Sequence, residues 1–167
     1  AGYRVLDLSQ YLAGAGVTRL LAELGPEIIK VELAPMGDPG RLIPWLVDDR
    51  SSFFVQNNRG KQSLCLDWDQ PEGLQIIKDL IPQCDILVEN FQPGTLEGWG
   101  LGWDVLHAVN PRLIMVRISG FGQTGPYKGR PGFGRIGNAF GGLSFLAGYP
   151  DRPPVTPGSA TLSDYMS

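Results

Sequence analysis

The chain has 167 residues, which is enough for one domain with a substantial hydrophobic core. Its formal net charge of −3 gives no indication of a nucleic-acid surface, and no apolar run is long enough to cross a membrane. Two cysteines without metal-type spacing, Cys65 and Cys84, and a single histidine, His107, predict no Cys/His metal site. This composition is typical of a reducing compartment, and we expect a cytoplasmic protein.

The start of the chain predicts a strand, a helix and a second strand. Residues 3–9 and residues 27–32 have the apolar character of strands. Between them, apolar residues recur at helical spacing, and Gly25-Pro26 ends the helix. The residues on this apolar face are Val17, Leu20, Leu21 and Leu24. Short connections between the three elements predict a right-handed crossover in a parallel sheet.

The same segment imitates a dinucleotide-binding loop. Gly14 and Gly16 follow the first strand, and Glu32 ends the second, where an acidic residue would bind a ribose. However, Arg19 stands where the fingerprint needs a third glycine for close helix packing. We therefore keep the binding of NAD or FAD only as a lesser alternative.

Residues 34–60 are predicted to form a long irregular region, and loops of this length are often functional. Arg41, Arg59 and Lys61 are candidate phosphate partners. For any one of them, ordinary solvated surface charge is the stronger alternative.

Residues 63–66 predict a short strand, which a helix follows. Asp69 is the expected N-cap of this helix, because a proline lies in the first turn and a glutamate three residues after the cap. Leu74, Ile77 and Ile81 continue its inner face, and Pro82 marks its end.

The apolar run over residues 86–88 predicts a strand that is buried on both faces of the sheet. In open parallel sheets, ligands bind outside the carboxyl ends of the strands. Asn90 lies at such an end and offers both a donor and an acceptor, and Phe91 offers a flat apolar face. The alternative is structural: Asn90 caps the turn, and Phe91 closes the edge of the sheet.

The second half of the chain is rich in glycine and proline. It predicts a helix over residues 103–109 and a strand over residues 113–119, which runs into the glycine-rich loop 120–126. A further helix is expected over residues 136–147, broken or closely packed at Gly141-Gly142. Two successive strands therefore end in loops of the kind that bind ligands.

Asp164 is the carboxylate best placed for chemistry. It follows the proline-rich loop 149–158 and lies at the predicted start of a helix at Ser163, whose dipole and free N–H groups would keep it ionised. An ionised carboxylate in a cleft can attack an activated carbonyl group. The alternative is that Asp164 is simply an N-cap or first-turn residue.

Taken in order, these motifs resemble the family III CoA-transferases (CaiB/BaiF), the group of formyl-CoA and carnitine CoA-transferases that also includes α-methylacyl-CoA racemase. The matching segments follow the family's order along the full length of the chain. They are residues 4–9, 12–14, 20–25, 29–32, 37–38, 58–61, 88–94, 110–113, 118–126 and 163–165.

The resemblance implies an α/β fold with a doubly wound, Rossmann-like parallel sheet, helices on both faces and CoA bound at the strand ends. Asn90 and Phe91 match the family's CoA-contacting pair. Tyr11, Leu12 and Ala13 match the backbone stretch beside the thiol end of CoA. The resemblance implies no metal and no permanently bound cofactor, because CoA and acyl-CoA are substrates.

Asp164 corresponds to the family's nucleophile. The implied reaction moves CoA from an acyl-CoA donor to a carboxylic acid acceptor through an aspartyl–acyl anhydride and an aspartyl-CoA thioester. The resemblance also implies an interlocked homodimer, with neither nucleic acid nor membrane as a partner.

Two departures from the family pattern concern the chemistry. Gly98 stands where most members have an arginine that helps to hold CoA. Phe133-Gly134 stand where racemase-type members carry a His-Asp pair, which disfavours α-proton exchange. Gly134 also replaces an acidic residue that is common in the transferases.

Length is the largest departure, because family members are much longer. We expect residues 1–167 to be the N-terminal CoA-binding α/β domain of a larger transferase, cut just after the nucleophile position. A truncated or degenerate module that binds CoA without catalysis is the main alternative, and a 2-methylacyl-CoA racemase is a lesser one.

Overall fold

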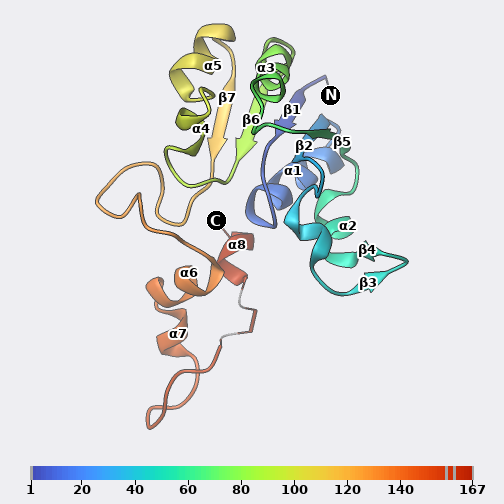
Figure 1. Cartoon of the computed structure of the whole chain (residues 1–167). Coiled ribbons are helices and arrows are strands. Elements are labelled where there is room, and N and C mark those ends of the chain that lie inside the picture. Colours follow the sequence, from blue (N-terminus) through green and yellow to red (C-terminus); the bar gives the residue numbers. More distant parts are fainter. Residues whose placement is uncertain (1, 157, 160, 167) are drawn as a thin grey trace. The chain divides into compact units, whose positions relative to one another are not determined.

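The computed structural model describes residues 2–156, 158–159 and 161–166. The chain divides into two compact units, residues 1–118 and residues 119–167, which are described separately below (Figure 1).

The first unit is built around a parallel sheet with the strand order β5-β2-β1-β6-β7. Its strands are β1 (Arg4–Asp7), β2 (Glu27–Leu33), β5 (Gln62–Leu66), β6 (Ile86–Glu89) and β7 (Ile114–Arg117). The chain winds outward from β1 in one direction and from β6 in the other, so these two neighbours form the topological switch point of the sheet. The predicted parallel, doubly wound fold is confirmed.

Helices cover both faces of the sheet, and each face has its own apolar core. Val5 packs with Ile28 on one face, together with residues of α1 (Ala13–Glu23), which α2 (Ser52–Asn58) contacts. Leu6 points to the opposite face, because successive strand residues alternate in direction. There it joins a larger core with residues of α3 (Pro71–Leu80), α4 (Thr95–Gly98) and α5 (Trp103–Val109).

The predicted apolar face of α1 is wrong in detail. Leu20 and Leu24 are 52% and 78% exposed, whereas the buried positions are Gly14, Ala15 and Thr18. Small side chains let this helix lie close to the sheet, and the Thr18 hydroxyl donates to the buried carboxylate of Asp7 at 2.6 Å. Val17 and Leu21 are half-buried, and Leu21 packs against the Val5 core, so the predicted face is covered only in part.

Residues 34–60 are also more regular than predicted. They contain a short 3-10 helix (Pro39–Leu42), an antiparallel hairpin of β3 (Leu46–Val47) and β4 (Arg50–Ser51), and then α2. The Ser51 hydroxyl accepts a hydrogen bond from the Phe54 N–H and so caps α2. The strands of this hairpin are too short for an alternating pattern to reveal them in the sequence.

The helix after β5 begins with a different cap from the one predicted. Gln70 is its N-cap residue, and Pro71 is the first helical position. The Asp69 N–H instead donates to the Asp67 side chain, because residues 67–70 form a turn before the helix. Ile77 and Ile81 are buried, as predicted.

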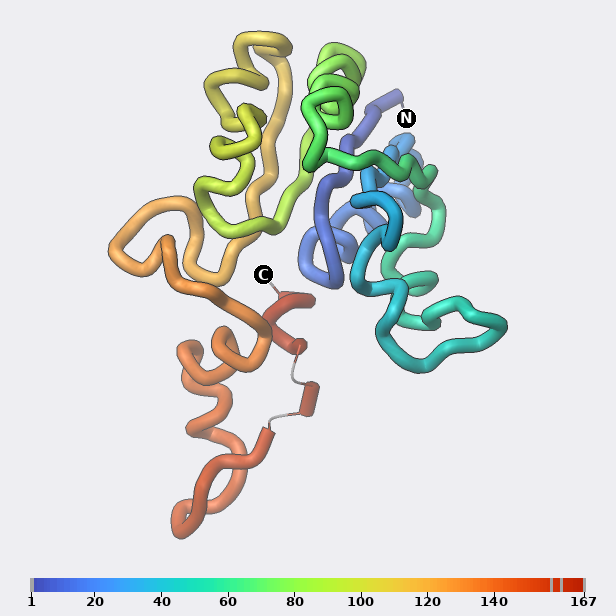
Figure 2. The backbone as a smooth tube through the Cα atoms, in the orientation of Figure 1, coloured from blue at the N-terminus to red at the C-terminus, as the bar shows by residue number. Residues whose placement is uncertain are grey.

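The second unit starts with a loop without regular structure that extends to residue 133 (Figure 2). Gly120 and Gly132 approach so closely that a Cβ on either residue would lie 2.4 Å from the other's Cα. The loop is followed by α6 (Gly134–Phe140), α7 (Leu143–Leu146) and α8 (Leu162–Met166). The predicted break at Gly141-Gly142 is confirmed; of the predicted loop 149–158, Pro157 lies outside the described residues.

Candidate functional site

Asn90 joins the ends of the two strands at the switch point. Its Nδ2 donates to the Gln10 carbonyl at 2.8 Å, and its Oδ1 accepts from the Gln10 N–H at 2.8 Å. Both halves of the amide thus hold the backbone that follows β1. The predicted donor and acceptor of Asn90 are engaged within the protein, so this side chain shapes the loop.

The segment that Asn90 holds leads directly into α1. Tyr11 is 46% exposed and has a left-handed backbone with φ of 61°, which a tyrosine rarely adopts. Leu12 is buried and stands at the N-cap of α1, with no side chain capping the helix there. Ala13 is half-buried and begins the helix. The structure therefore places Tyr11, Leu12 and Ala13 beside Asn90 at the carboxyl ends of the strands.

Phe91 is partly in the core. Its ring lies edge-on to Trp99 and to Trp68, with centroid distances of 5.0 and 6.3 Å. The Phe91 N–H donates to the buried carboxylate of Glu89 at 2.7 Å. The ring is half-buried rather than fully open.

Glu89 forms part of an ion-pair network that the sequence analysis missed. Arg117 of β7 donates to Glu89 at 2.8 Å and to Glu97 at 2.6 Å. Burial raises the pKa of Glu89, and the hydrogen bonds from Arg117 and Phe91 oppose this only in part. A buried acid directly before Asn90 thus fixes the turn that carries the two predicted site residues.

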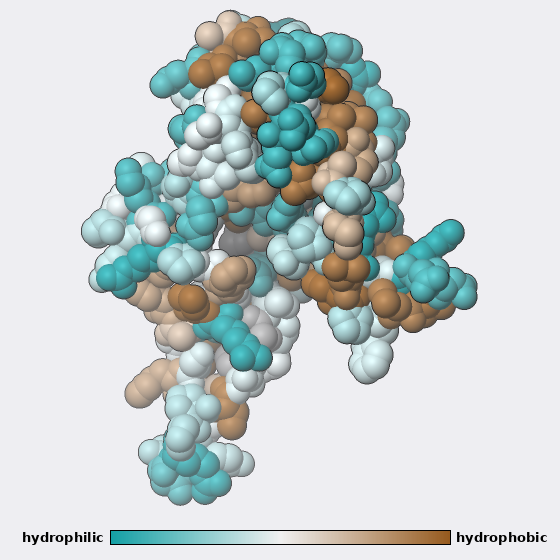
Figure 3. Space-filling view, in the orientation of Figure 1, coloured by the Kyte–Doolittle hydropathy of each residue, from teal (hydrophilic) through white to brown (hydrophobic). Residues whose placement is uncertain are grey.

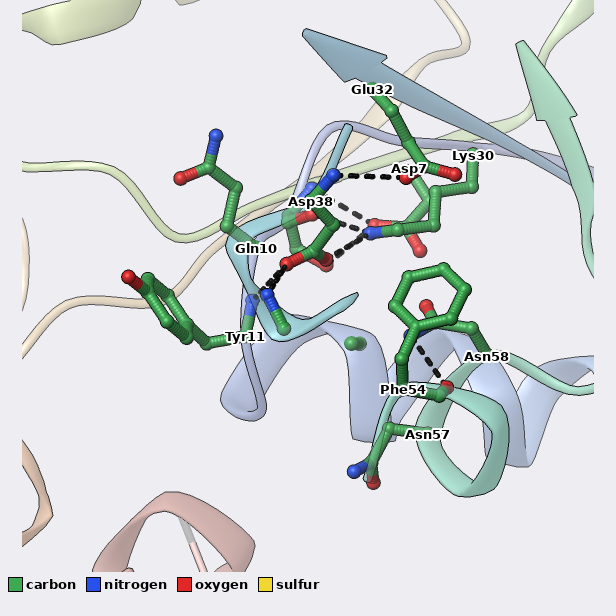
Figure 4. A network of polar contacts seen from close by, with 12 residues as sticks. Asp7, Gln10, Tyr11, Lys30, Glu32, Asp38, Phe54, Asn57 and Asn58 are labelled. Atoms are coloured by element: carbon green, nitrogen blue, oxygen red, sulfur yellow. Dashed lines mark hydrogen bonds and ion pairs between the residues drawn. The ribbon is translucent and has the colours of Figure 1, made fainter. Parts of the chain in front are cut away.

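A second buried network lies beneath the segment Ser9–Tyr11 (Figure 4). Lys30 Nζ of β2 lies 2.9 Å from Asp38 Oδ2, and Lys61 Nζ lies 2.9 Å from Asp7 Oδ2. All four side chains are at most 2% exposed. The pKa of Asp7 is lowered: burial would raise it, but Lys30 and Lys61 outweigh that effect. Burial lowers the pKa of Lys61 to about 8, although Asp7 opposes the shift.

These contacts correct the list of candidate phosphate partners. Lys61 is buried, so it is neither a phosphate partner nor a solvated surface charge. Arg41 binds both carboxylate oxygens of Glu32, at 2.7 and 2.8 Å, and lies over the ring of Phe54. Arg59 is half-exposed and pairs with Glu23.

The same contacts remove the main support for a dinucleotide site. One oxygen of Glu32 accepts from Arg41 and from the Ser63 hydroxyl, and the other accepts from Arg41 and from the Asp38 N–H. A carboxylate with four such donors has no place for ribose hydroxyls.

Gly98, where the family arginine is missing, is exposed at the end of α4. A Cβ at this position would meet no atom within 4 Å. The structure therefore leaves room for a side chain there.

Asp164 lies in the first turn of α8, as predicted. Burial raises the pKa of its carboxyl group. The helix has five residues, and its dipole is correspondingly small.

Glycine lets α8 approach α6 closely. The Ser163 hydroxyl donates to the Gly134 carbonyl at 2.9 Å. A Cβ on Gly137 would lie 2.6 Å from the Ser163 Oγ and 2.9 Å from its Cβ. The position of Asp164 on α8 therefore depends on its neighbour Ser163 and on a bare helix surface at Gly137.

Two cavities within the described residues lie elsewhere. One of about 440 Å³ lies at the amino ends of the strands and is lined by Arg4, Glu27 and Asp85 among others. Another of about 140 Å³ lies in the second unit, against Arg135 and Asn138. Within the described residues, no three His, Cys, Asp or Glu side chains gather as metal ligands, and no helix is long and apolar enough to cross a bilayer.

Comparisons with known proteins agree with this architecture. The family model for CoA-transferase family III matches residues 1–167. The chain is 50% identical to the succinyl-CoA–L-malate CoA-transferase beta subunit of Chloroflexus aurantiacus, covering all of this chain and 42% of that protein. It is 41% identical to the succinyl-CoA:glutarate CoA-transferase of Mus musculus, covering 95% of this chain and 37% of that protein.

A solved structure shows the same fold. The crystal structure of a CAIB/BAIF family protein from Brucella suis aligns with a TM-score of 0.88 at 36% identity, over 99% of this chain and 46% of that chain. The chain thus spans less than half the length of each of these relatives. With a family match along its whole length and the corresponding sheet topology, the chain belongs to CoA-transferase family III.

Proposed function

We propose that the protein transfers CoA from an acyl-CoA donor to a carboxylic acid, and that residues 1–167 are the N-terminal domain that binds CoA and carries the nucleophile. The observation that carries this proposal is the family match over the whole chain, with relatives named CoA-transferases. The loops at the switch point support it, since ligands of open α/β sheets bind there.

In the proposed first half-reaction, an oxygen of Asp164 attacks the thioester carbonyl of the acyl-CoA. The C–S bond breaks, CoA leaves as a thiolate, and a mixed anhydride forms. The thiolate then attacks the aspartyl carbonyl, which releases the donor acid as a carboxylate and leaves an aspartyl-CoA thioester.

The second half-reaction repeats these steps with the acceptor. Its carboxylate attacks the aspartyl thioester and displaces the CoA thiolate, and the thiolate attacks the acceptor's carbonyl in the new anhydride. The product is the acceptor's CoA thioester, and Asp164 is again a carboxylate. Atoms and charge balance without an oxidant, a reductant or a metal.

Binding of CoA is assigned to two backbone segments, Tyr11–Ala13 and Asn90–Phe91. The two-way hydrogen bond between Asn90 and Gln10 supports this assignment, because it gives both segments one fixed geometry. Preorganised backbone groups bind a ligand at a lower entropic cost.

Succinyl-CoA is the first donor to test, because several relatives carry it in their names. Dicarboxylic and hydroxydicarboxylic acids are the first acceptors to test, because the names of the same relatives contain malate, citramalate and glutarate. A racemase reaction is disfavoured, because Phe133 is an exposed apolar residue and Gly134 has no side chain to act as a base.

An interlocked homodimer in the full-length protein remains part of the proposal. Its support is apolar surface that the first unit leaves uncovered: Trp45, Leu46 and Val47 around the β3–β4 hairpin are 82%, 54% and 66% exposed. Figure 3 shows hydrophobic surface at this hairpin. Patches of this kind mark interaction sites.

The test uses the full-length protein and its Asp164→Ala variant. With succinyl-CoA alone, mass spectrometry should find an acyl or CoA adduct on Asp164 of the native protein and none on the variant. The variant should lose transfer and still bind CoA. Transfer by Asp164→Ala would disprove the role of this residue, and CoA binding without any transfer by the native protein would favour the non-catalytic module.

A further inference from the structure

The proposed reaction gives no role to two deeply buried charges of the first unit, Lys30 and Asp38. Both side chains are 1% exposed, and Lys30 Nζ lies 2.9 Å from Asp38 Oδ2. A buried ion pair rarely adds net stability over apolar side chains of similar size. Stability alone therefore does not explain why these two charges are buried as a pair.

Both members of the pair hold the backbone that leads to the CoA-binding segment. Lys30 Nζ donates to the Ser9 carbonyl at 2.7 Å. Asp38 Oδ1 accepts from the Tyr11 N–H at 3.1 Å, and also from the Gly40 N–H at 2.7 Å. In Figure 4, the Lys30 side chain points toward Asp38, and Asp38 lies between Lys30 and Tyr11.

Asp38 is itself rigidly placed. Its own N–H donates to Glu32 at 2.9 Å, and Arg41 holds Glu32 with both ends of its guanidinium group. The anchor for Tyr11 is therefore fixed by a chain of charged groups that extends to the end of β2.

Tyr11 needs such an anchor. A left-handed backbone is unfavourable for a residue with a side chain, and it persists when the surroundings fix it. Asn90 holds Gln10, and the Lys30–Asp38 pair holds the residues on either side of Gln10.

We propose that Asp38, oriented by Lys30, is a positioning residue for CoA: its carboxylate fixes the Tyr11 amide and thereby the backbone of Tyr11–Ala13 against which the thiol end of CoA lies. This inference rests on the proposed function, since it concerns the same segment.

The test compares two double variants of the full-length protein, Lys30→Met/Asp38→Asn and Lys30→Met/Asp38→Ala. Methionine replaces the ammonium in both, so neither variant buries an unpaired charge. Asparagine keeps an oxygen for the Tyr11 N–H, whereas alanine removes it. The two variants thus differ in the hydrogen bonds that this oxygen accepts, from the Tyr11 N–H and from the Gly40 N–H.

The dissociation constant of CoA, measured by calorimetry, should be about tenfold higher for the alanine variant than for the asparagine variant, which is the effect of one lost hydrogen bond. The KM for the acyl-CoA should rise with it while kcat stays the same, as for a loss of uniform binding. Equal dissociation constants in the two variants would overturn the proposal.

A second variant covers the case in which the alanine variant does not fold. Replacing Tyr11 by its α-hydroxy analogue converts the amide to an ester and deletes the same N–H with the ion pair intact. It should raise the dissociation constant by the same factor, and an unchanged constant would overturn the proposal.

The core variant Ile77→Ala serves as the control for stability, because Ile77 is a buried residue of α3 that belongs to neither Tyr11–Ala13 nor Asn90–Phe91. It should lower the Tm and leave the dissociation constant unchanged. Failure of the native protein to bind CoA would disprove the proposed function instead, so the two failures are distinguishable.

Discussion

At the scale of single residues, charges buried beside the strand ends link stability to pH. The pKa of Glu32 is lowered to about 2: burial would raise it, but hydrogen bonds from Arg41, the Asp38 N–H and Ser63 outweigh burial. A lowered pKa stabilises the folded state above the ordinary pKa of a glutamate. That stabilisation is lost as the pH falls from about 4.5 to about 2.

We therefore predict that Glu32 contributes roughly 2–3 kcal/mol to the loss of unfolding free energy between pH 6 and pH 2. Urea unfolding of the native protein and of Glu32→Gln across this range measures the contribution, which the glutamine variant should lack. Glu27→Gln, on the same strand but half-exposed, is the control. Parallel pH profiles for the native protein and Glu32→Gln would contradict the prediction.

The exposed position of Gly98 allows a test of where CoA binds. Because a side chain fits there and arginine is a better helix former than glycine, Gly98→Arg should not lower stability. If the proposed CoA site is right, the added charge should strengthen CoA binding by about three- to tenfold at low salt, and less at high salt.

The matched control is Gly98→Gln, which is long and polar but uncharged. Calorimetric titration with CoA at two salt concentrations compares the two variants. If they bind CoA equally well, position 98 does not face a phosphate group.

Which single residues carry function was only partly predictable. The order of motifs in the sequence pointed to Asn90 and Asp164. It did not indicate that Asn90 would form hydrogen bonds with Gln10, which lies 80 positions away. Lys30 lies inside an apolar strand, and Asp38 lies in a region predicted to be irregular. Their pairing arises only when the tertiary structure brings β2 and the following turn together.

At the scale of elements, the sheet was predictable and the packing of α1 was not. All five strands of the sheet were located from the sequence, and the three central ones, β1, β2 and β6, have the apolar runs of strands buried on both faces. The buried positions of α1 are small residues, and of the predicted leucines only Leu21 packs against the core, while Leu20 and Leu24 are exposed. Leucines predict burial, but they do not say whether the covering partner lies in the same unit.

The close contact between α6 and α8 leads to a prediction about the rate of CoA transfer. Gly137→Ala would place a methyl group against Ser163 and force α8, with Asp164, to shift. Displacement of a reacting group by about 1 Å can lower a rate about a hundredfold, so we expect a loss of transfer of that order with CoA binding unchanged. Steady-state kinetics and CoA titration measure the two effects.

Gly129→Ala is the control in the same unit, because a Cβ there meets no atom within 4 Å. It should leave transfer unchanged. Native rates for Gly137→Ala would show that α8 does not depend on this close approach.

At the scale of the whole molecule, one sheet topology can serve two kinds of ligand. A doubly wound sheet can hold a dinucleotide or another ligand at its switch point. Here the acidic residue that would select a ribose is bound by Arg41, Ser63 and the Asp38 backbone, and the switch-point loops are joined through Asn90. Together with the family match, these contacts favour CoA over NAD.

Calorimetric titration of the full-length protein with CoA and, in parallel, with NAD tests the preference for CoA. That preference predicts that CoA binds, that NAD does not, and that Asn90→Ala weakens the binding of CoA by releasing the Gln10 backbone. Binding of NAD alone, or CoA binding that is unaffected by Asn90→Ala, would contradict it.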